Sequence, residues 1–89
     1  MTEFQRRVHG IIRGSRRGEV LTYGEIAEEA GRSRAARAVG NVLAVSKGLP
    51  WWRVVASDGR LVPGKEAQQA RRLRAEGVPI HGGKVRMTA

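Results

Sequence analysis

Apolar residues near the start of the chain recur at the spacing of an α-helix. Phe4, Val8 and Ile12 lie four residues apart and would share one helical face. The tetrapeptide that begins at Thr2 has the form of a capping box, in which the side chains of the first and fourth residues each bond the other's backbone N–H. This pattern predicts a first helix over about residues 3–14.

A second capping box begins at Thr22, directly after a short extended segment at residues 20–21. It predicts a short helix that ends at Ala30, where Gly31 can adopt the left-handed conformation that stops a helix. Only two or three residues separate this helix from the next amphipathic segment, so we expect the two helices to be joined by a tight turn.

The third helix is predicted over about residues 34–45, with Ser33 as its N-cap. Its apolar face consists of Ala35, Val39, Val42 and Leu43, and its other face of Ser33, Arg34, Arg37, Gly40, Asn41 and Ala44. Gly40 costs about 1 kcal/mol relative to alanine inside a helix, which indicates that something approaches the backbone closely there. A short helix, a turn and a basic amphipathic helix together predict a helix-turn-helix.

A β-hairpin is predicted to follow this helix-turn-helix. Residues 51–56 have the composition of a strand, Asp58 and Gly59 form a tight-turn dipeptide, and residues 61–62 would be the returning strand. We call this hairpin of residues 51–62 the predicted wing.

The rest of the chain is predicted as a basic helix over about residues 65–76 and a short extended segment over residues 78–87. The expected fold class is therefore mostly α with a small β-hairpin, a winged helix-turn-helix-like domain. We expect a single domain over residues 1–89, with residues 78–89 as a loosely ordered tail.

The net charge of +9 is confined to one part of the chain. Residues 1–31 contain five arginines and five glutamates, whereas residues 32–89 contain twelve basic and three acidic residues. Such an excess predicts a polyanion as partner, and nucleic acid first among polyanions. The alternative is a highly soluble surface in a protein whose composition favours arginine.

Few residues could carry catalysis or bind a metal. The chain has no cysteine, hence no thiol nucleophile or thiolate ligand, and its two histidines, His9 and His81, lie near opposite ends. Asp58 is explained by its turn and Glu76 by its helix end, and no glycine-rich phosphate loop is present. We therefore expect no enzyme activity, no metal and no cofactor.

Trp51 and Trp52 make up half of the aromatic residues. Adjacent residues on a strand point to opposite sides, so one indole would face the core and the other the basic edge. An exposed indole can stack on a nucleobase, which is worth about 1–3 kcal/mol. From the residues alone, core packing and nucleic-acid binding remain equally good explanations.

Three segments in order, residues 20–27, 35–40 and 49–55, resemble the DNA-binding domain of O6-alkylguanine-DNA alkyltransferases. Those enzymes carry a Pro-Cys-His-Arg-Val motif whose cysteine accepts the alkyl group, and this chain has Pro-Trp-Trp-Arg-Val from Pro50. Tryptophan at the cysteine position is the mark of alkyltransferase-like proteins, which bind O6-alkylguanine without repairing it. The resemblance covers about residues 3–80.

The resemblance implies roles for individual residues. Arg37 would be the finger that fills the gap left by a flipped nucleotide, and Tyr23 would help to rotate the phosphate on the 3′ side of the lesion. The third helix would enter the minor groove through Ser33, Arg34, Ala38, Gly40 and Asn41. The lesion pocket would comprise Pro50, Trp51, Trp52, Val54 and Lys65, and the DNA backbone would be contacted by Thr22, Arg32, Arg53 and Arg60. For Arg37 an ordinary phosphate contact, and for Tyr23 simple packing, remain alternatives.

The chain departs from the family pattern in three places. Trp52 stands where the family usually has histidine, which leaves open which indole faces the lesion. The segments over residues 44–49 and 60–65 are shorter than usual. Some relatives place a cation over the flipped base, for which Lys65 is the first candidate and Arg60 the second.

Together these features predict a monomeric DNA-damage sensor. It would flip O6-alkylguanine from duplex DNA into a tryptophan-lined pocket, leave the alkyl group in place and mark the lesion for nucleotide excision repair proteins. No membrane partner is expected, and the expected location is the cytoplasm, on the nucleoid in a bacterium. The alternatives are a winged-helix transcriptional regulator or nucleoid protein without lesion preference and, third, an enzyme that uses a group other than cysteine.

Overall fold

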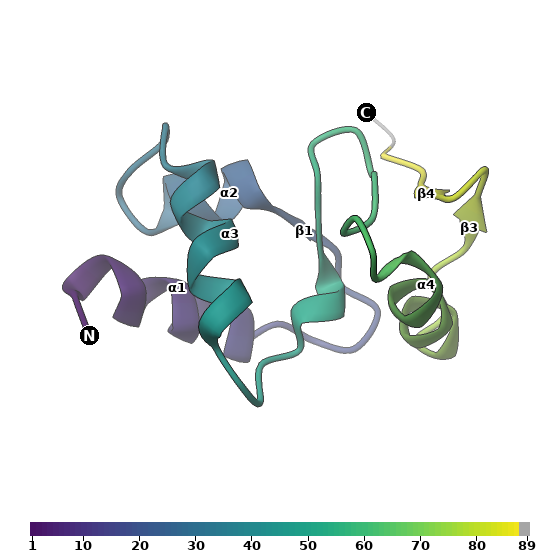
Figure 1. The fold of residues 1–89 in the computed structure, drawn as a ribbon, viewed down its shortest axis with the longest axis horizontal. Helices are drawn as coiled ribbons and strands as arrows, with labels where there is room; N and C mark the ends of the chain where they lie inside the picture. The colour runs from purple at the N-terminus through teal and green to yellow at the C-terminus, as the bar shows by residue number, and fades with distance from the viewer. Residues whose placement is uncertain (88–89) are drawn as a thin grey trace.

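The computed structural model describes residues 1–87, most of whose regular structure is helical, as predicted. In chain order its elements are α1 (Glu3–Arg13), β1 (Leu21–Thr22), α2 (Tyr23–Glu29), α3 (Ala36–Val45), the 3₁₀ helix η1 (Trp51–Arg53), β2 (Val54–Val55), α4 (Glu66–Ala75), β3 (Ile80–His81) and β4 (Lys84–Val85) (Figure 1). No helix in this part of the chain is both long and apolar enough to cross a membrane. The last two residues of the predicted tail, 88–89, lie outside the described part.

Helices α1, α2 and α3 enclose one of two apolar cores. Phe4, Val8 and Ile12 face this core from α1 and are at most 8% exposed, as their spacing predicts. Val39 and Val42 face it from α3. The three helices form one side of the molecule, and α4 lies on the other side (Figure 1).

Both predicted capping boxes are present. Thr2 Oγ1 accepts the backbone N–H of Gln5, and Thr22 Oγ1 accepts that of Glu25. In each box the N3 side chain accepts the backbone N–H of the threonine in return. The second box begins α2 at the residue after Thr22, which places Tyr23 in the first turn of that helix.

Helix α3 begins later than predicted, and Ser33 is not its N-cap. Ser33 and Arg34 lie in the turn before the helix, whose N-cap is Ala35 without a side-chain hydrogen bond. The backbone N–H of Ala35 donates to the carbonyl of Arg32, so residues 32–35 close a turn of their own before the helix starts. This separate turn leaves Ser33 outside the helix that its capping signal would begin.

The predicted wing is wrong as a hairpin. Residues 51–53 turn as η1 instead of extending, and β2 pairs in parallel with β1, with Leu21 opposite Val54 and Thr22 opposite Val55. Both valines are fully buried, so β2 has apolar packing on both faces, whereas the strand of an exposed hairpin would have it on one.

The tight turn inside the predicted wing is nevertheless present. Gly59 has φ +88° and donates its N–H to the Ala56 carbonyl. A Cβ on Gly59 would overlap the carbonyl oxygen of Val85, which means that this glycine also lets β4 approach the turn. Arg60 completes the contact through an antiparallel bridge to Lys84.

Residues 78–87, predicted as a short extended segment, contain two paired strands. β3 and β4 form an antiparallel hairpin that pairs Ile80 with Val85 and His81 with Lys84. Val85 is 6% exposed and packs with Leu73 of α4 in the second apolar core. The small β-hairpin of the predicted fold class therefore exists, but it is formed by the segment that follows α4.

Candidate functional site

The outward face of α3 is basic and carries little bulk. Val39 and Val42 point inward, whereas Arg37, Asn41 and Ala44 are exposed, as the helical spacing predicts. Helix α3 contains no acidic residue. The face therefore carries a positive charge from Arg37 and little side-chain bulk, which suits contact with a phosphate backbone or a groove of nucleic acid.

Tyr23 of α2 lies against α3 at Gly40. A Cβ on Gly40 would be 3.8 Å from Cε1 of Tyr23, an ordinary contact, so the protein's own packing does not require glycine here. Tyr23 is half-buried, and this burial raises the pKa of its phenol above the ordinary value of 10. The hydroxyl is thus protonated at neutral pH and can donate a hydrogen bond.

A hollow of about 430 Å³, which we call the α3 pocket, opens beside this contact. It brings together four of the residues predicted for the site: Tyr23, Gly40, Trp51 and Lys65. The Lys65 ammonium lies 5.2 Å from the centroid of the Trp51 ring, within the range of a cation–π contact. The pocket has the size of a typical small-molecule site.

The two tryptophans have different surroundings. Trp51 lines the α3 pocket, whereas Trp52 packs against the core under α4, and the two rings meet edge to face at 6.4 Å. The indole N–H of Trp52 donates to Glu76, and the guanidinium carbon of Arg72 lies 4.5 Å from its ring centroid. Trp52, predicted for the lesion pocket, is therefore absent from the lining of the α3 pocket, and Trp51 is the indole that lines it.

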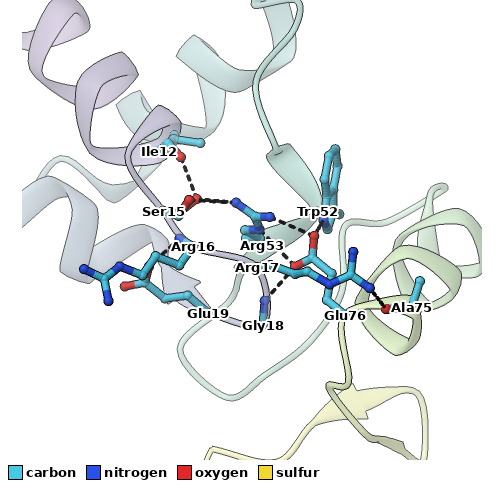
Figure 2. A network of polar contacts seen from close by, with 10 residues as sticks. All are labelled: Ile12, Ser15, Arg16, Arg17, Gly18, Glu19, Trp52, Arg53, Ala75 and Glu76. Atoms are coloured by element: carbon cyan, nitrogen blue, oxygen red, sulfur yellow. Dashed lines mark hydrogen bonds and ion pairs between the residues drawn. The ribbon is translucent and has the colours of Figure 1, made fainter.

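The guanidinium group of Arg53 also has its hydrogen-bond partners within the protein. Its Nε and Nη2 donate to the two carboxylate oxygens of Glu76 at 2.9 Å each, and Nη1 donates to the carbonyl and hydroxyl of Ser15 (Figure 2). Arg53 and Glu76 side chains are only 12% and 7% exposed. Arg53, which the sequence assigns to the DNA backbone, is thus held in a largely buried, bidentate ion pair within the protein.

Glu76 is the centre of this network. Its carboxylate also accepts the backbone N–H of Gly18, and hydrogen bonds from Arg53 are the main cause that lowers its pKa from 4.5 to about 2. Figure 2 shows the carboxylate between the loop after α1 and the residues of η1. The network thereby connects η1, which contains Trp51, to the loop after α1 and to the end of α4.

Three other predicted site residues have structural surroundings. Val54 is fully buried in the first core and cannot line an open pocket. Thr22 is 7% exposed, and its hydroxyl caps α2. Pro50 precedes η1 and is absent from the lining of the α3 pocket. The sequence motif therefore places these residues next to the site, but burial separates Val54 and Thr22 from it.

The remaining predicted contacts lie on the surface. Arg32 is exposed, with its guanidinium carbon 5.2 Å from the centroid of the Phe4 ring. Arg34 and Ser33 are exposed in the turn before α3, and Ala38 is half-buried on the helix. Arg60 is exposed, and its Nε lies 2.9 Å from an Asp58 carboxylate oxygen. These residues are positioned to reach a ligand that lies along α3 or beside the Gly59 turn.

Gln69 is a site-shaping residue that sequence reasoning missed. It is fully buried, and its amide donates to the carbonyls of Trp52 and Val54 and accepts the backbone N–H of Val62. Val62 lines the α3 pocket. A polar residue on the inner face of the basic helix was the one available signal, because such a residue must find partners when buried.

Residues 1–87 contain no cluster of three or more histidine, cysteine, aspartate or glutamate side chains that could hold a metal ion. The two histidines lie on different elements, α1 and β3. His9 is hydrogen-bonded through Nε2 to the Ser46 hydroxyl at 2.9 Å, and His81 is on β3. The chemistry of the site rests on an indole, a phenol and cationic side chains.

A helix-turn-helix-like unit joined to η1, β2 and α4 defines the alkyltransferase class of DNA-binding domain. The family model for the DNA-binding domain of 6-O-methylguanine DNA methyltransferase matches residues 3–78. The chain therefore belongs to this family, and within it the chain is alkyltransferase-like.

Individual relatives share much of the chain. The DNA base-flipping protein of Escherichia coli is 44% identical over 84 residues, which span 89% of this chain and 65% of that protein. The crystal structure of S. pombe Atl1 in complex with damaged DNA containing O6-carboxymethylguanine has a TM-score of 0.83 at 35% identity, over 91% of this chain and 82% of that one. Mycobacterium tuberculosis OGT in complex with DNA has a TM-score of 0.76 at 32% identity, over 86% and 50%. The chain thus spans just under two thirds of the E. coli relative.

Proposed function

We propose that this protein is a DNA-damage sensor that binds O6-alkylguanine in duplex DNA and leaves the alkyl group in place. The observation that carries the proposal is Trp51. It lines the α3 pocket at the motif position where alkyltransferases have the accepting cysteine, and the chain has no cysteine elsewhere. The pocket can therefore hold an alkylated base but offers no thiol to receive its alkyl group.

Binding would begin at α3, which enters the minor groove with its small and basic face. Arg37 fills the gap in the base stack, and Tyr23, whose neutral hydroxyl can donate, turns the phosphate on the 3′ side of the lesion. Gly40 lets the DNA approach the helix backbone. Further groove and backbone contacts come from Ser33, Arg34, Ala38, Asn41, Arg32 and Arg60. Extrusion of a nucleotide costs a few kcal/mol, least for a poorly paired base, which favours the lesion before the pocket is reached.

The flipped base would then occupy the α3 pocket. Trp51 contacts the alkyl group and base, and the Lys65 ammonium lies over the same indole. Apolar contact with one added methyl group is worth about 1–3 kcal/mol. The pocket therefore prefers alkylated guanine by one to two orders of magnitude at most and still admits guanine.

The outcome of binding would be a signal. A monomer bound to a lesion that it does not remove presents a stable protein–DNA surface, which we propose marks the site for nucleotide excision repair proteins. The S. pombe relative crystallised with damaged DNA containing O6-carboxymethylguanine supports lesion binding by this class of protein.

The test is a titration of three duplexes at one fixed salt concentration: O6-methylguanine, guanine, and a scrambled sequence. The proposal predicts tighter binding to the first and recovery of the intact O6-methylguanine afterwards. Equal affinity for the first two would refute lesion recognition. A strong preference between the undamaged sequences would indicate a transcriptional regulator instead, and loss of the methyl group would indicate an enzyme.

A further inference from the structure

A second hollow of about 400 Å³ lies next to the α3 pocket and shares two of its walls. Tyr23 and Val62 line both. Its other walls come from Ala56 and Arg60 beside the Gly59 turn, from the segment that leads into α4, and from the tip of the β3–β4 hairpin. Because the α3 pocket is the proposed site of the flipped base, this neighbouring hollow lies where the adjoining part of the same DNA strand would pass.

The lining of the second hollow combines an apolar wall with cations. Ala56, Leu61 and Val62 provide aliphatic surface, and Arg60 and Lys84 provide two positive charges against the one carboxylate of Glu66. A deoxyribose presents carbon-rich faces, and its phosphate carries one negative charge. The lining therefore matches a sugar–phosphate unit better than a base. A base would need an aromatic ring to stack on, and Tyr23 is the one aromatic residue in this lining.

Arg60 and Lys84 are held side by side. Their backbones form an antiparallel bridge between the Gly59 turn and β4. Asp58 lies between their side chains, with carboxylate oxygen distances of 2.9 Å to Arg60 Nε and 4.0 Å to Lys84 Nζ. The ion pairs leave the terminal guanidinium nitrogens of Arg60 and the ammonium protons of Lys84 for a second acceptor, since both side chains are at least half exposed.

The tip of the hairpin is built without side chains. Gly82 and Gly83 have φ +58° and +76°, and a Cβ on either would meet no heavy atom within 4 Å. The turn needs glycine for its positive φ angles, and the result is a low rim beside Lys84. A DNA backbone can therefore pass close to the hairpin.

The geometry points to a second DNA-binding element: the β3–β4 hairpin and the Gly59 turn form a sugar–phosphate cradle for the nucleotide next to the flipped one. Arg60 and Lys84 bind its phosphate, Asp58 is the positioning residue for both cations, and Tyr23 separates the cradle from the α3 pocket. The inference rests on the proposed function, which it deepens by assigning the neighbouring strand. The hairpin thereby takes the place of the wing that the sequence predicts at residues 51–62.

The test combines one charge-removing variant with single neutral phosphates. Lys84→Gln is compared with Arg86→Gln, which removes the same charge two residues away, where Arg86 lines a different hollow. Each protein is titrated with O6-methylguanine duplexes that carry one methylphosphonate at successive positions on both sides of the lesion. We expect Lys84→Gln to weaken binding about tenfold and to reduce the salt dependence by about one phosphate.

One methylphosphonate next to the lesion should lower the affinity of the wild-type protein about as much as Lys84→Gln does. The same methylphosphonate should leave the affinity of the Lys84→Gln variant almost unchanged. Arg86→Gln should keep the full methylphosphonate effect. Equal effects of the two substitutions, or a methylphosphonate effect of the same size in Lys84→Gln and wild type at every position, would overturn the cradle. Equal affinity of the wild type for lesion and guanine duplexes would instead refute the proposed function, so the two failures are distinguishable.

Discussion

Replacement of Glu76 by glutamine should remove a large part of the stability of the fold. The Glu76 carboxylate accepts hydrogen bonds from Arg53, Trp52 and Gly18, and its side chain is 7% exposed. Glutamine has nearly the same shape but no charge and only one acceptor oxygen. It would leave the Arg53 guanidinium buried without its counter-ion, which typically costs about 3–5 kcal/mol.

The pKa of Glu76 gives a second measure of this magnitude. Lowering of the pKa from 4.5 to about 2 corresponds to roughly 3 kcal/mol at neutral pH, at about 1.4 kcal/mol per pKa unit. Since the folded-state pKa is the lower one, this stabilisation is complete well above pH 4.5 and is lost as the pH falls towards 2. By about pH 3, about 2 kcal/mol of it should be gone.

The assay is urea denaturation followed by far-UV circular dichroism, at pH 7 and at steps down to pH 3. Glu76→Gln should lower the free energy of unfolding by about 3 kcal/mol at pH 7 and should show a flatter acid dependence than the wild type. Glu28→Gln, which alters an exposed carboxylate of α2, is the control and should change stability by no more than about 0.5 kcal/mol. If Glu76→Gln cost less than about 1 kcal/mol and its stability fell with pH in parallel with the wild type, the Arg53–Glu76 ion pair would not be what stabilises the fold.

Three further substitutions address the Gly59 turn, the α3 face and the arginine finger. Gly59→Ala should destabilise the protein by about 3 kcal/mol in the same assay, because the new Cβ would overlap the Val85 carbonyl at a φ of +88°; unchanged stability would show that β4 does not pack on the turn. Gly40→Ala should raise stability by up to about 1 kcal/mol, since the Cβ fits beside Tyr23, yet weaken DNA binding; unweakened binding would argue against close approach of DNA to α3. Arg37→Ala should reduce the affinity ratio between lesion and guanine duplexes, whereas Arg71→Ala on α4 should leave that ratio unchanged and at most reduce the salt dependence. Equal ratios in the two variants would refute the finger role of Arg37.

Local signals were sufficient for much of the helical structure. The capping boxes at Thr2 and Thr22 involve residues only three apart, and both form as the sequence predicts. The inner face of α3 follows from helical spacing alone, because Val39 and Val42 must be covered by something. The capping signal at Ser33 is wrong because backbone hydrogen bonds of Arg32 and Ala35 close turns between α2 and α3, and the helix begins only after them.

Non-local pairing explains what could not be predicted. The composition of residues 51–56 and the Asp-Gly turn after them predict a hairpin strand, but residues 54–55 are buried on both faces and pair with β1, far earlier in the chain. The orientation of the two indoles depends on the end of α4, since the Trp52 N–H is fixed by Glu76. A glutamate at a helix end has an adequate local explanation, so nothing nearby in the sequence indicates its partner Arg53.

The candidate site divides in the same way. The structure brings Tyr23, Gly40, Trp51 and Lys65 together around one pocket, although only Trp51 and Lys65 of these were predicted to line it. The residues predicted for the site also include Val54, which is buried, and Arg53, which is paired inside the protein. A motif specifies neighbours along the chain, whereas exposure depends on the three-dimensional packing of each neighbour.

The emission of Trp51 reports whether the damaged base enters the α3 pocket. The chain has two tryptophans, so in the Trp52→Phe variant the intrinsic indole emission comes from Trp51 in that pocket. A nucleobase stacked on this indole would change its emission. We expect a saturating change on titration with an O6-methylguanine duplex and a much smaller one with the guanine duplex at the same fraction bound. An emission that stays constant while the lesion duplex binds would contradict the proposed function, because the damaged base would then lie outside the Trp51 pocket.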